Sequence, residues 1–150
     1  MKSLRDPGVA QELAERMARL RPGSRSLWGR MNAHQMLCHL NDSFLLAMGE
    51  KAASADTNFL KRTLVKRIAL WLPMPWPHGV PTRPEMDQLQ GGTPPVAFEH
   101  DAAGLRRSIE RFAAMSGGFA EHPIFGAMTV HEWQRWGWLH CDHHFRQFGI

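Results

Sequence analysis

The prolines and glycines of this chain are gathered in a way that limits the folds open to it. Seven prolines and three glycines fall between residues 73 and 95. Proline breaks the hydrogen-bond ladder of a helix interior, so this stretch cannot be one regular element. On both sides of it apolar residues recur at helical spacing, and no strand alternation is evident. The sequence therefore predicts an all-α fold in which residues 73–95 form a long ordered loop across the helices, a kind of loop that is often functional.

Five helices are expected from the apolar spacing and from start and stop signals. They cover roughly residues 7–21, 33–49, 57–72, 101–116 and 130–148. Asn32 with Gln35, and Thr129 with Glu132, have the spacing of a capping box, which marks the start of a helix. Asp101 is expected to cap the fourth helix.

The third expected helix is the most basic part of the chain. Leu60, Leu64, Ile68 and Trp71 are expected on its buried side, with Lys and Arg on the other face. The formal net charge of the whole chain is +4, but its Lys and Arg residues are dispersed in local pairs and form no dense run. Such pairs are typical of a solvated helix face, so nucleic-acid binding is not expected.

Length and composition predict an ordinary globular protein. Residues 1–150 fit a single domain, with 43% hydrophobic and 21% charged residues. No run of 18 apolar residues predicts a membrane span, and the N-terminus lacks the apolar run of a secretory signal, so a cytoplasmic location is expected. Cys38 and Cys141 are expected to remain thiols in a reducing compartment, with a disulfide between them as the alternative.

The last expected helix carries the most informative chemistry. His140 and His144 are one turn apart, so both rings lie on one face and can share a metal ion. The spacing alone also fits histidines that cap, form hydrogen bonds or line a surface. Because Trp133 and Trp136 make this the most aromatic helix, unpaired imidazoles there would cost free energy that a metal would offset. His39, expected to point inward from the second helix, is the third candidate ligand.

Other polar residues near these three have less direct roles. Asp142 and His143 lie off the face that carries His144, and Gln147 is three residues beyond it. They remain candidates to support the site, because ligating imidazoles commonly donate their second N–H to an oxygen. Cys38 lies about 100° from His39 around the helix and is expected to be a core or supporting thiol.

The remaining histidines are expected to do no metal chemistry. His34 is about 140° from His39 around the helix, so the two should not share an ion. Four others lie in loops or at helix starts, where solvated or capping roles are expected: His78, His100, His122 and His131. No glycine-rich phosphate fingerprint is present, and Ser43 beside His39 lacks a nucleophile elbow.

Three segments together resemble the DinB/YfiT-like superfamily of metal-dependent helical bundle proteins, and within it a subfamily of unknown function. The segments are residues 28–40 (WGRMNAHQMLCHL), 122–126 (HPIFG) and 136–149 (WGWLHCDHHFRQFG). The resemblance implies a four-helix bundle with an additional helix, often dimeric, that holds zinc or nickel through three histidines. By position these are His39 in the first segment and His140 and His144 in the last.

The resemblance also implies a class of activity. Relatives in that superfamily include thiol-S-transferases that use bacillithiol or mycothiol, and an isomerase of maleylpyruvate, so a metal that lowers the pKa of a bound thiol is expected. This chain departs from those enzymes around residues 73–95, where a cosubstrate would be recognised. Trp28, Trp136 and that loop are expected to shape a pocket for a small-molecule substrate, and Asp42 or Asp142 to orient a ligand. Metal-dependent hydrolysis and a non-catalytic stress-response or dimerisation role remain the alternatives.

Overall fold

The computed structural model describes residues 1–150, and all of its regular elements are helices. The helices are α1 (Val9–Met17), α2 (Ala33–Ala47), α3 (Lys66–Trp71), α4 (Phe98–Ala114) and α5 (Val130–Gln147), with a π-helical segment η1 (Lys61–Val65) and a 3₁₀ turn η2 (Pro84–Met86). The only β-type pairing is an isolated bridge between His122 and Gly126. The all-α prediction is confirmed. No helix combines the length and apolar character that crossing a bilayer requires.

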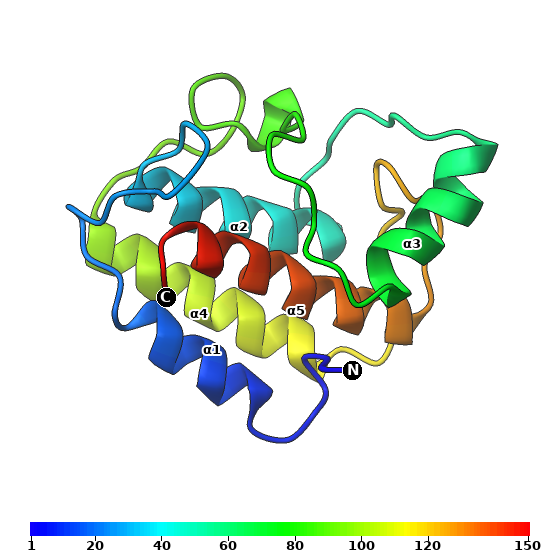
Figure 1. The fold of residues 1–150 in the computed structure, drawn as a ribbon, viewed down its shortest axis with the longest axis horizontal. Helices are drawn as coiled ribbons and strands as arrows, with labels where there is room; N and C mark the ends of the chain where they lie inside the picture. The colour runs from blue at the N-terminus through cyan, green and yellow to red at the C-terminus, as the bar shows by residue number, and fades with distance from the viewer.

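Helices α1, α2, α4 and α5 lie side by side, and α3 stands at one end of them (Figure 1). α4 contacts α1, α2 and α5, and α5 contacts α1, α2 and α3 as well. A single core of 21 buried apolar residues fills the space between these helices. Its largest fully buried side chains are aromatic, namely Phe44 on α2, Phe112 on α4, and Trp133 and Phe145 on α5. The packing of α2 against α5 brings the two histidine-bearing helices together.

Both expected capping boxes are formed, and they set the starts of α2 and α5. The Asn32 side chain accepts a hydrogen bond from the backbone N–H of Gln35 at 2.8 Å, and the Gln35 side chain accepts one from Asn32 N–H at 2.9 Å. Thr129 and Glu132 exchange the same pair of bonds at 3.2 and 2.7 Å. Because these bonds satisfy N–H groups that have no partner inside the helix, they fix where each helix begins.

One expected helix start and one expected helix end differ clearly from the structure. α4 begins at Phe98, three residues before Asp101, so Asp101 is not its cap residue. Its carboxylate instead reaches back from within the first turns and accepts a hydrogen bond from Val96 N–H at 2.9 Å. α1 ends at Met17, earlier than expected, although Leu20 beyond it is still buried.

The expected buried side of the third helix is wrong. Leu60, Leu64 and Ile68 are 55%, 54% and 42% exposed, and only Leu70 of this helical stretch is fully buried. The cause is tertiary. α5 contacts α3 but not η1, and the π-helical hydrogen bonds of η1 shift its residues out of the 3.6-residue pattern. An apolar stripe therefore faces outward beside the basic residues.

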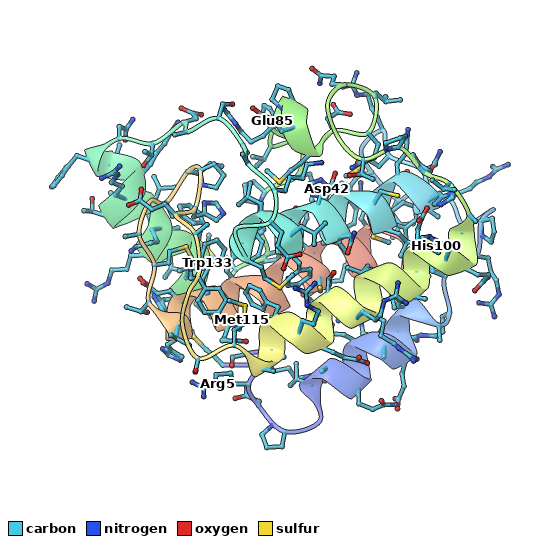
Figure 2. All side chains as sticks on the ribbon, turned by 180° about the vertical axis from the view of Figure 1, so that it is seen from behind. Arg5, Asp42, Glu85, His100, Met115 and Trp133 are labelled. Atoms are coloured by element: carbon cyan, nitrogen blue, oxygen red, sulfur yellow. The ribbon has the colours of Figure 1, made fainter.

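The segment between α3 and α4 contains no regular element except η2 and is tied to α2 by a buried carboxylate. Asp42 on α2 accepts hydrogen bonds from Thr93 N–H at 2.8 Å and from the Thr93 hydroxyl at 2.6 Å. It also accepts one from Gln88 and forms an ion pair with Lys51 at 2.9 Å. Figure 2 shows Asp42 on the side of α2 that this segment covers. These contacts hold η2, and with it Met86, beside His39 of α2.

Candidate metal centre

Three histidines from two helices converge in the interior between α2 and α5. His39 comes from α2, and His140 and His144 come from successive turns of α5. The Nε2 atoms of His39 and His140 are 3.2 Å apart, and one ring nitrogen from each of the three rings lies within 4.8 Å of the others. His39 and His144 are buried, and His140 is half-buried. We call these three residues the histidine cluster; the structure brings together the trio expected from the sequence.

The backbone carbonyl of Met86 fixes the tautomer of His39. The Nδ1 of His39 lies 2.9 Å from this carbonyl oxygen, which can only accept a hydrogen bond. Nδ1 must therefore carry the proton, and Nε2 of the neutral ring then presents its lone pair toward His140. Orientation of this kind, in which the second nitrogen donates to a carbonyl, is typical of metal-binding imidazoles.

Gln147 plays the equivalent part for His144. Its side-chain oxygen lies 2.8 Å from His144 Nδ1, while its amide nitrogen donates to the backbone carbonyl of Trp28 at 2.7 Å. The Trp28 carbonyl settles which end of the amide is which, so the Gln147 oxygen accepts from His144 Nδ1–H. His144 Nε2 is thereby left with a lone pair. Gln147, a candidate supporting residue, therefore contacts a histidine of the cluster directly.

Electrostatics keep the cluster neutral. The pKa values of His140 and His144 are well below the usual histidine value, first because of burial and then because neighbouring imidazoles repel a second charge. Burial also lowers the pKa of His39. His140 Nδ1 is buried without any hydrogen-bond partner, so nothing in the protein satisfies both nitrogens of this ring. Neutral imidazoles, each with one ring nitrogen within 4.8 Å of the others, are a donor set that fits a divalent cation.

Aromatic rings cover the outer side of the cluster. Trp76, from the segment after α3, lies with its ring centroid 5.9 Å from that of His140, and its indole N–H donates to the Ala69 carbonyl at 2.8 Å. Trp28 and His78 stack on each other with centroids 3.9 Å apart. His143 lies 6.0 Å from the Trp76 ring. Trp28, Trp76, His78 and His143 thus form an aromatic rim beside the histidine cluster.

A cavity of about 310 Å³ opens beside this rim. Its lining includes the four rim residues, the prolines 73 and 75, and the side chains of Arg135, Asp142 and Arg146. A space of this size is at the lower end of small-molecule pockets. No histidine of the cluster lines this cavity. Two of its lining residues, Trp76 and His143, pack against the cluster, with ring centroids 5.9 Å from His140 and 5.1 Å from His144, respectively.

The other expected site residues fall into two groups. Trp136 packs on the His140 ring with centroids 4.9 Å apart, so it is a wall of the cluster. Asp142 forms ion pairs with Arg16 at 2.8 Å and with Arg146 at 3.7 Å, and makes no hydrogen bond to a histidine. The carboxylate oxygens of Asp42 likewise accept hydrogen bonds from Thr93 and form an ion pair with Lys51. Neither carboxylate orients a histidine of the cluster.

Several features of the site have no sequence signal or a weak one. The Met86 carbonyl is a backbone group, so no residue type could reveal it. Trp76 and His78 lie in the proline-rich stretch, where composition alone indicated a covering segment. His122 is buried and not solvated; its Nδ1 accepts hydrogen bonds from Ile124 and Phe125 N–H, both at 3.1 Å. That role is a turn cap, which was the other expectation for this residue.

Both cysteines are free, as expected, and no disulfide joins them. Burial, and after it the nearby Asp101 carboxylate, raises the pKa of the Cys38 thiol to about 12. Burial also raises the pKa of Cys141, which lies in the apolar core. Neither thiol contacts the histidine cluster.

Comparison with known proteins gives one positive result. The model of a family described as "Protein of unknown function (DUF1569)" matches residues 8–149. No curated protein and no solved structure matches the chain. The match covers all the helices and every residue of the histidine cluster. The chain therefore belongs to the DUF1569 family.

Proposed function

We propose that this protein is a metal-dependent enzyme that binds one divalent cation, zinc or nickel, through His39, His140 and His144. The observation that carries the proposal is the convergence of three neutral imidazoles, two of which have their Nε2 lone pairs set by hydrogen bonds at Nδ1. Three protein ligands leave a coordination position free, which is the arrangement of catalytic sites and not of structural ones.

The proposal extends to the fold. We infer that α1, α2, α4 and α5 correspond to a DinB-like four-helix bundle, with α3 as the additional helix and residues 73–95 as the proline-rich loop. The side-by-side packing of these four helices supports this assignment, as does the meeting of the first resemblance segment with the last at the histidine cluster. A homodimer and a cytoplasmic location remain predictions from the sequence.

The residues around the cluster have separable tasks. A bound cation would act as a Lewis acid that lowers the pKa of a small nucleophile beside it. Met86 and Gln147 hold the imidazoles in place, and Trp136 with the aromatic rim limits the access of water. The adjacent cavity of about 310 Å³ is large enough to admit a small molecule.

A low-molecular-weight thiol is the nucleophile that the site supports best. Hydrolysis at a metal site can use a carboxylate as general base within hydrogen-bond reach of the water. Here Asp42 and Asp142 are engaged by Lys51, Thr93 and two arginines. A thiol needs less help from a base, because its ordinary pKa is about 8.5, far below that of water. A neighbouring cation lowers the thiol pKa further. We therefore place thiol transfer first and metal-dependent hydrolysis second.

Metal analysis of the protein purified without a histidine tag tests the site. We expect at least one equivalent of zinc or nickel per chain, and one equivalent fewer in His140→Ala and His144→Ala than in the wild type. His131→Ala is the matched control, since His131 is an exposed histidine at the start of the same helix. If the wild type binds no stoichiometric zinc or nickel, or if His140→Ala binds them as tightly as the control, the site is wrongly assigned.

A second experiment separates the nucleophiles. The zinc- or nickel-loaded protein is incubated with low-molecular-weight thiols and an alkylating electrophile, and the loss of free thiol is followed. In the expected reaction an S–C bond forms, the bond to the leaving group breaks, and the thiol proton passes to buffer. Turnover of an ester without any thiol would favour hydrolysis. Metal binding with neither activity would favour the non-catalytic alternative.

A further inference from the structure

A second group of ligand-type side chains lies where α2 packs against the first turns of α4. His34 and Cys38 are four residues apart on α2, so they project from the same side of that helix. Asp101 reaches them from α4. The Asp101 Oδ2 atom is 2.7 Å from His34 Nε2 and 3.7 Å from Cys38 Sγ. One donor atom from each of the three residues lies within 4.8 Å of the other two.

This group is separate from the histidine cluster although Cys38 and His39 are neighbours in sequence. Successive residues of a helix point about 100° apart, so His39 faces α5 and η2 while Cys38 faces α4. No hydrogen bond connects His34, Cys38 or Asp101 to a residue of the histidine cluster. An ion bound by one group would therefore leave the other group's ligands in place.

The group is placed so that a cation could reach it. Cys38 is 4% exposed, whereas the side chains of His34 and Asp101 are 22% and 15% exposed and open to solvent on one side. His100 lies beside them at the edge of the molecule (Figure 2). Its Nδ1 is 3.1 Å from the second carboxylate oxygen of Asp101, and its exposed side chain is free to supply a fourth donor.

We propose that His34, Cys38 and Asp101 form a second cation site that takes a thiophilic divalent ion such as zinc and ties α2 to α4. A thiolate, an imidazole and a carboxylate are the three side-chain types that zinc accepts. Donor atoms around one tetrahedral zinc are separated by roughly 3–4 Å, given Zn–S and Zn–N lengths of about 2.3 and 2.0 Å. The Sγ–Oδ2 separation of 3.7 Å already fits, and the closer His34 contact opens by rotation of an imidazole that is partly exposed.

The same atoms also have a role that needs no metal. Asp101 accepts a hydrogen bond from Val96 N–H and pairs with His34, and these contacts alone could fasten the start of α4 to α2. The two roles differ in one property. Only a cation site brings the Cys38 sulfur into bonding distance of a metal, and the histidine cluster contains no sulfur at all.

Titration of the untagged full-length protein with Co²⁺, in the presence of a reductant that contains no thiol, tests this difference. We expect two equivalents of Co²⁺ per chain and a sulfur-to-cobalt charge-transfer band whose amplitude accounts for one of them. The band should persist in His144→Ala and disappear in Cys38→Ser. Cys141→Ala is the matched control, because it removes the other buried cysteine and should keep the band and both equivalents.

Asp101→Asn keeps the proposal testable if Cys38→Ser does not fold. The asparagine oxygen can still accept the bond from Val96 N–H, so the helix start is retained while a charged ligand is lost. We expect the charge-transfer site to weaken by roughly tenfold or more. In a His144→Ala background, which removes a ligand of the histidine cluster, added zinc should still raise the midpoint of thermal unfolding, and it should no longer do so once Cys38→Ser or Asp101→Asn is added. A single Co²⁺ equivalent without a charge-transfer band, or a band that survives Cys38→Ser, would overturn the second site.

Discussion

Gln147 joins His144 to the backbone of a segment 119 residues earlier, and Gly29 leaves the room for that link. The amide of Gln147 donates to the Trp28 carbonyl, directly before Gly29. A Cβ atom on Gly29 would lie only 2.6 Å from Gln147 Nε2. Gly29 also has a φ of +78°, a backbone conformation that side-chain-bearing residues rarely adopt. This glycine therefore serves both the turn and the orientation of a candidate metal ligand.

The change Gly29→Ala should separate these two effects when it is compared with Gly118→Ala. Gly118 has the same φ of +78° and nothing within 4 Å of an added Cβ, so both variants should lose about 1–2 kcal/mol of stability from backbone strain. Only Gly29→Ala displaces the Gln147 amide, and we expect its zinc affinity to fall roughly 10–100-fold. Chelator competition measures the affinity and urea unfolding the stability. Equal zinc affinity in the two variants would show that Gln147 does not position His144.

Local chemistry explains why some elements could be predicted from sequence and others could not. The start of α2 and the start of α5 each depend on two side chains three residues apart, so the capping boxes at Asn32 and Thr129 were visible directly. The pair His140 and His144 was visible for a similar reason, since the two share a face whatever the tertiary structure, whereas the assignment of His39 relied more on the resemblance. The Met86 carbonyl was not, because η2 reaches His39 only through the fold of the intervening segment. The pairing of His34 and Cys38 with Asp101 also depends on how α4 packs.

The helical stretch of residues 59–71 shows where periodicity fails. An apolar stripe predicts which side of a helix is buried only if another element covers that side. Here α5 contacts α3, and the stretch before it extends past the end of α5's packing surface. Residues 57–84 carry five Lys and Arg and no Asp or Glu. The formal charge of this stretch is therefore +5, higher than the +4 of the whole chain. Sequence alone could identify this amphipathic pattern but not its outward orientation.

Two substitutions in this stretch should report the orientation. Leu64→Glu places a charge on a residue that is 54% exposed, so we expect the free energy of unfolding to change by less than about 0.5 kcal/mol. Leu70→Ala opens a cavity at a fully buried position and should cost about 2–5 kcal/mol. Urea unfolding followed by circular dichroism measures both. A large loss in Leu64→Glu would mean that the outward face is covered in solution.

At the scale of the whole molecule, the single core joins residues from nearly every element, and a buried histidine makes its stability depend on pH. His122 belongs to the segment that connects α4 to α5 in sequence. Its ring stacks on Phe125, and the residue is 7% exposed. Its Nδ1 accepts two backbone hydrogen bonds, which require an unprotonated nitrogen. Burial lowers the pKa of His122 to about 3. Protonation would remove both bonds and leave a charge beside Trp133 and Trp136.

The sign of the pH effect follows from which state binds the proton. In the unfolded chain His122 titrates near 6.5, and in the folded chain near 3, so between these values the unfolded state holds more protons. The stability contributed by the neutral ring is complete above pH 6.5 and is lost progressively as the pH falls toward 3.

His122→Asn should remove this dependence, because the asparagine oxygen can accept the same two N–H bonds without titrating. We expect wild type to lose stability faster than the variant, by up to about 1.4 kcal/mol per pH unit. Urea unfolding at several pH values, with chelator present throughout, isolates the difference because the histidine cluster contributes equally to both proteins. Identical slopes would show that His122 is not the buried neutral group that ties the loop before α5 to the core.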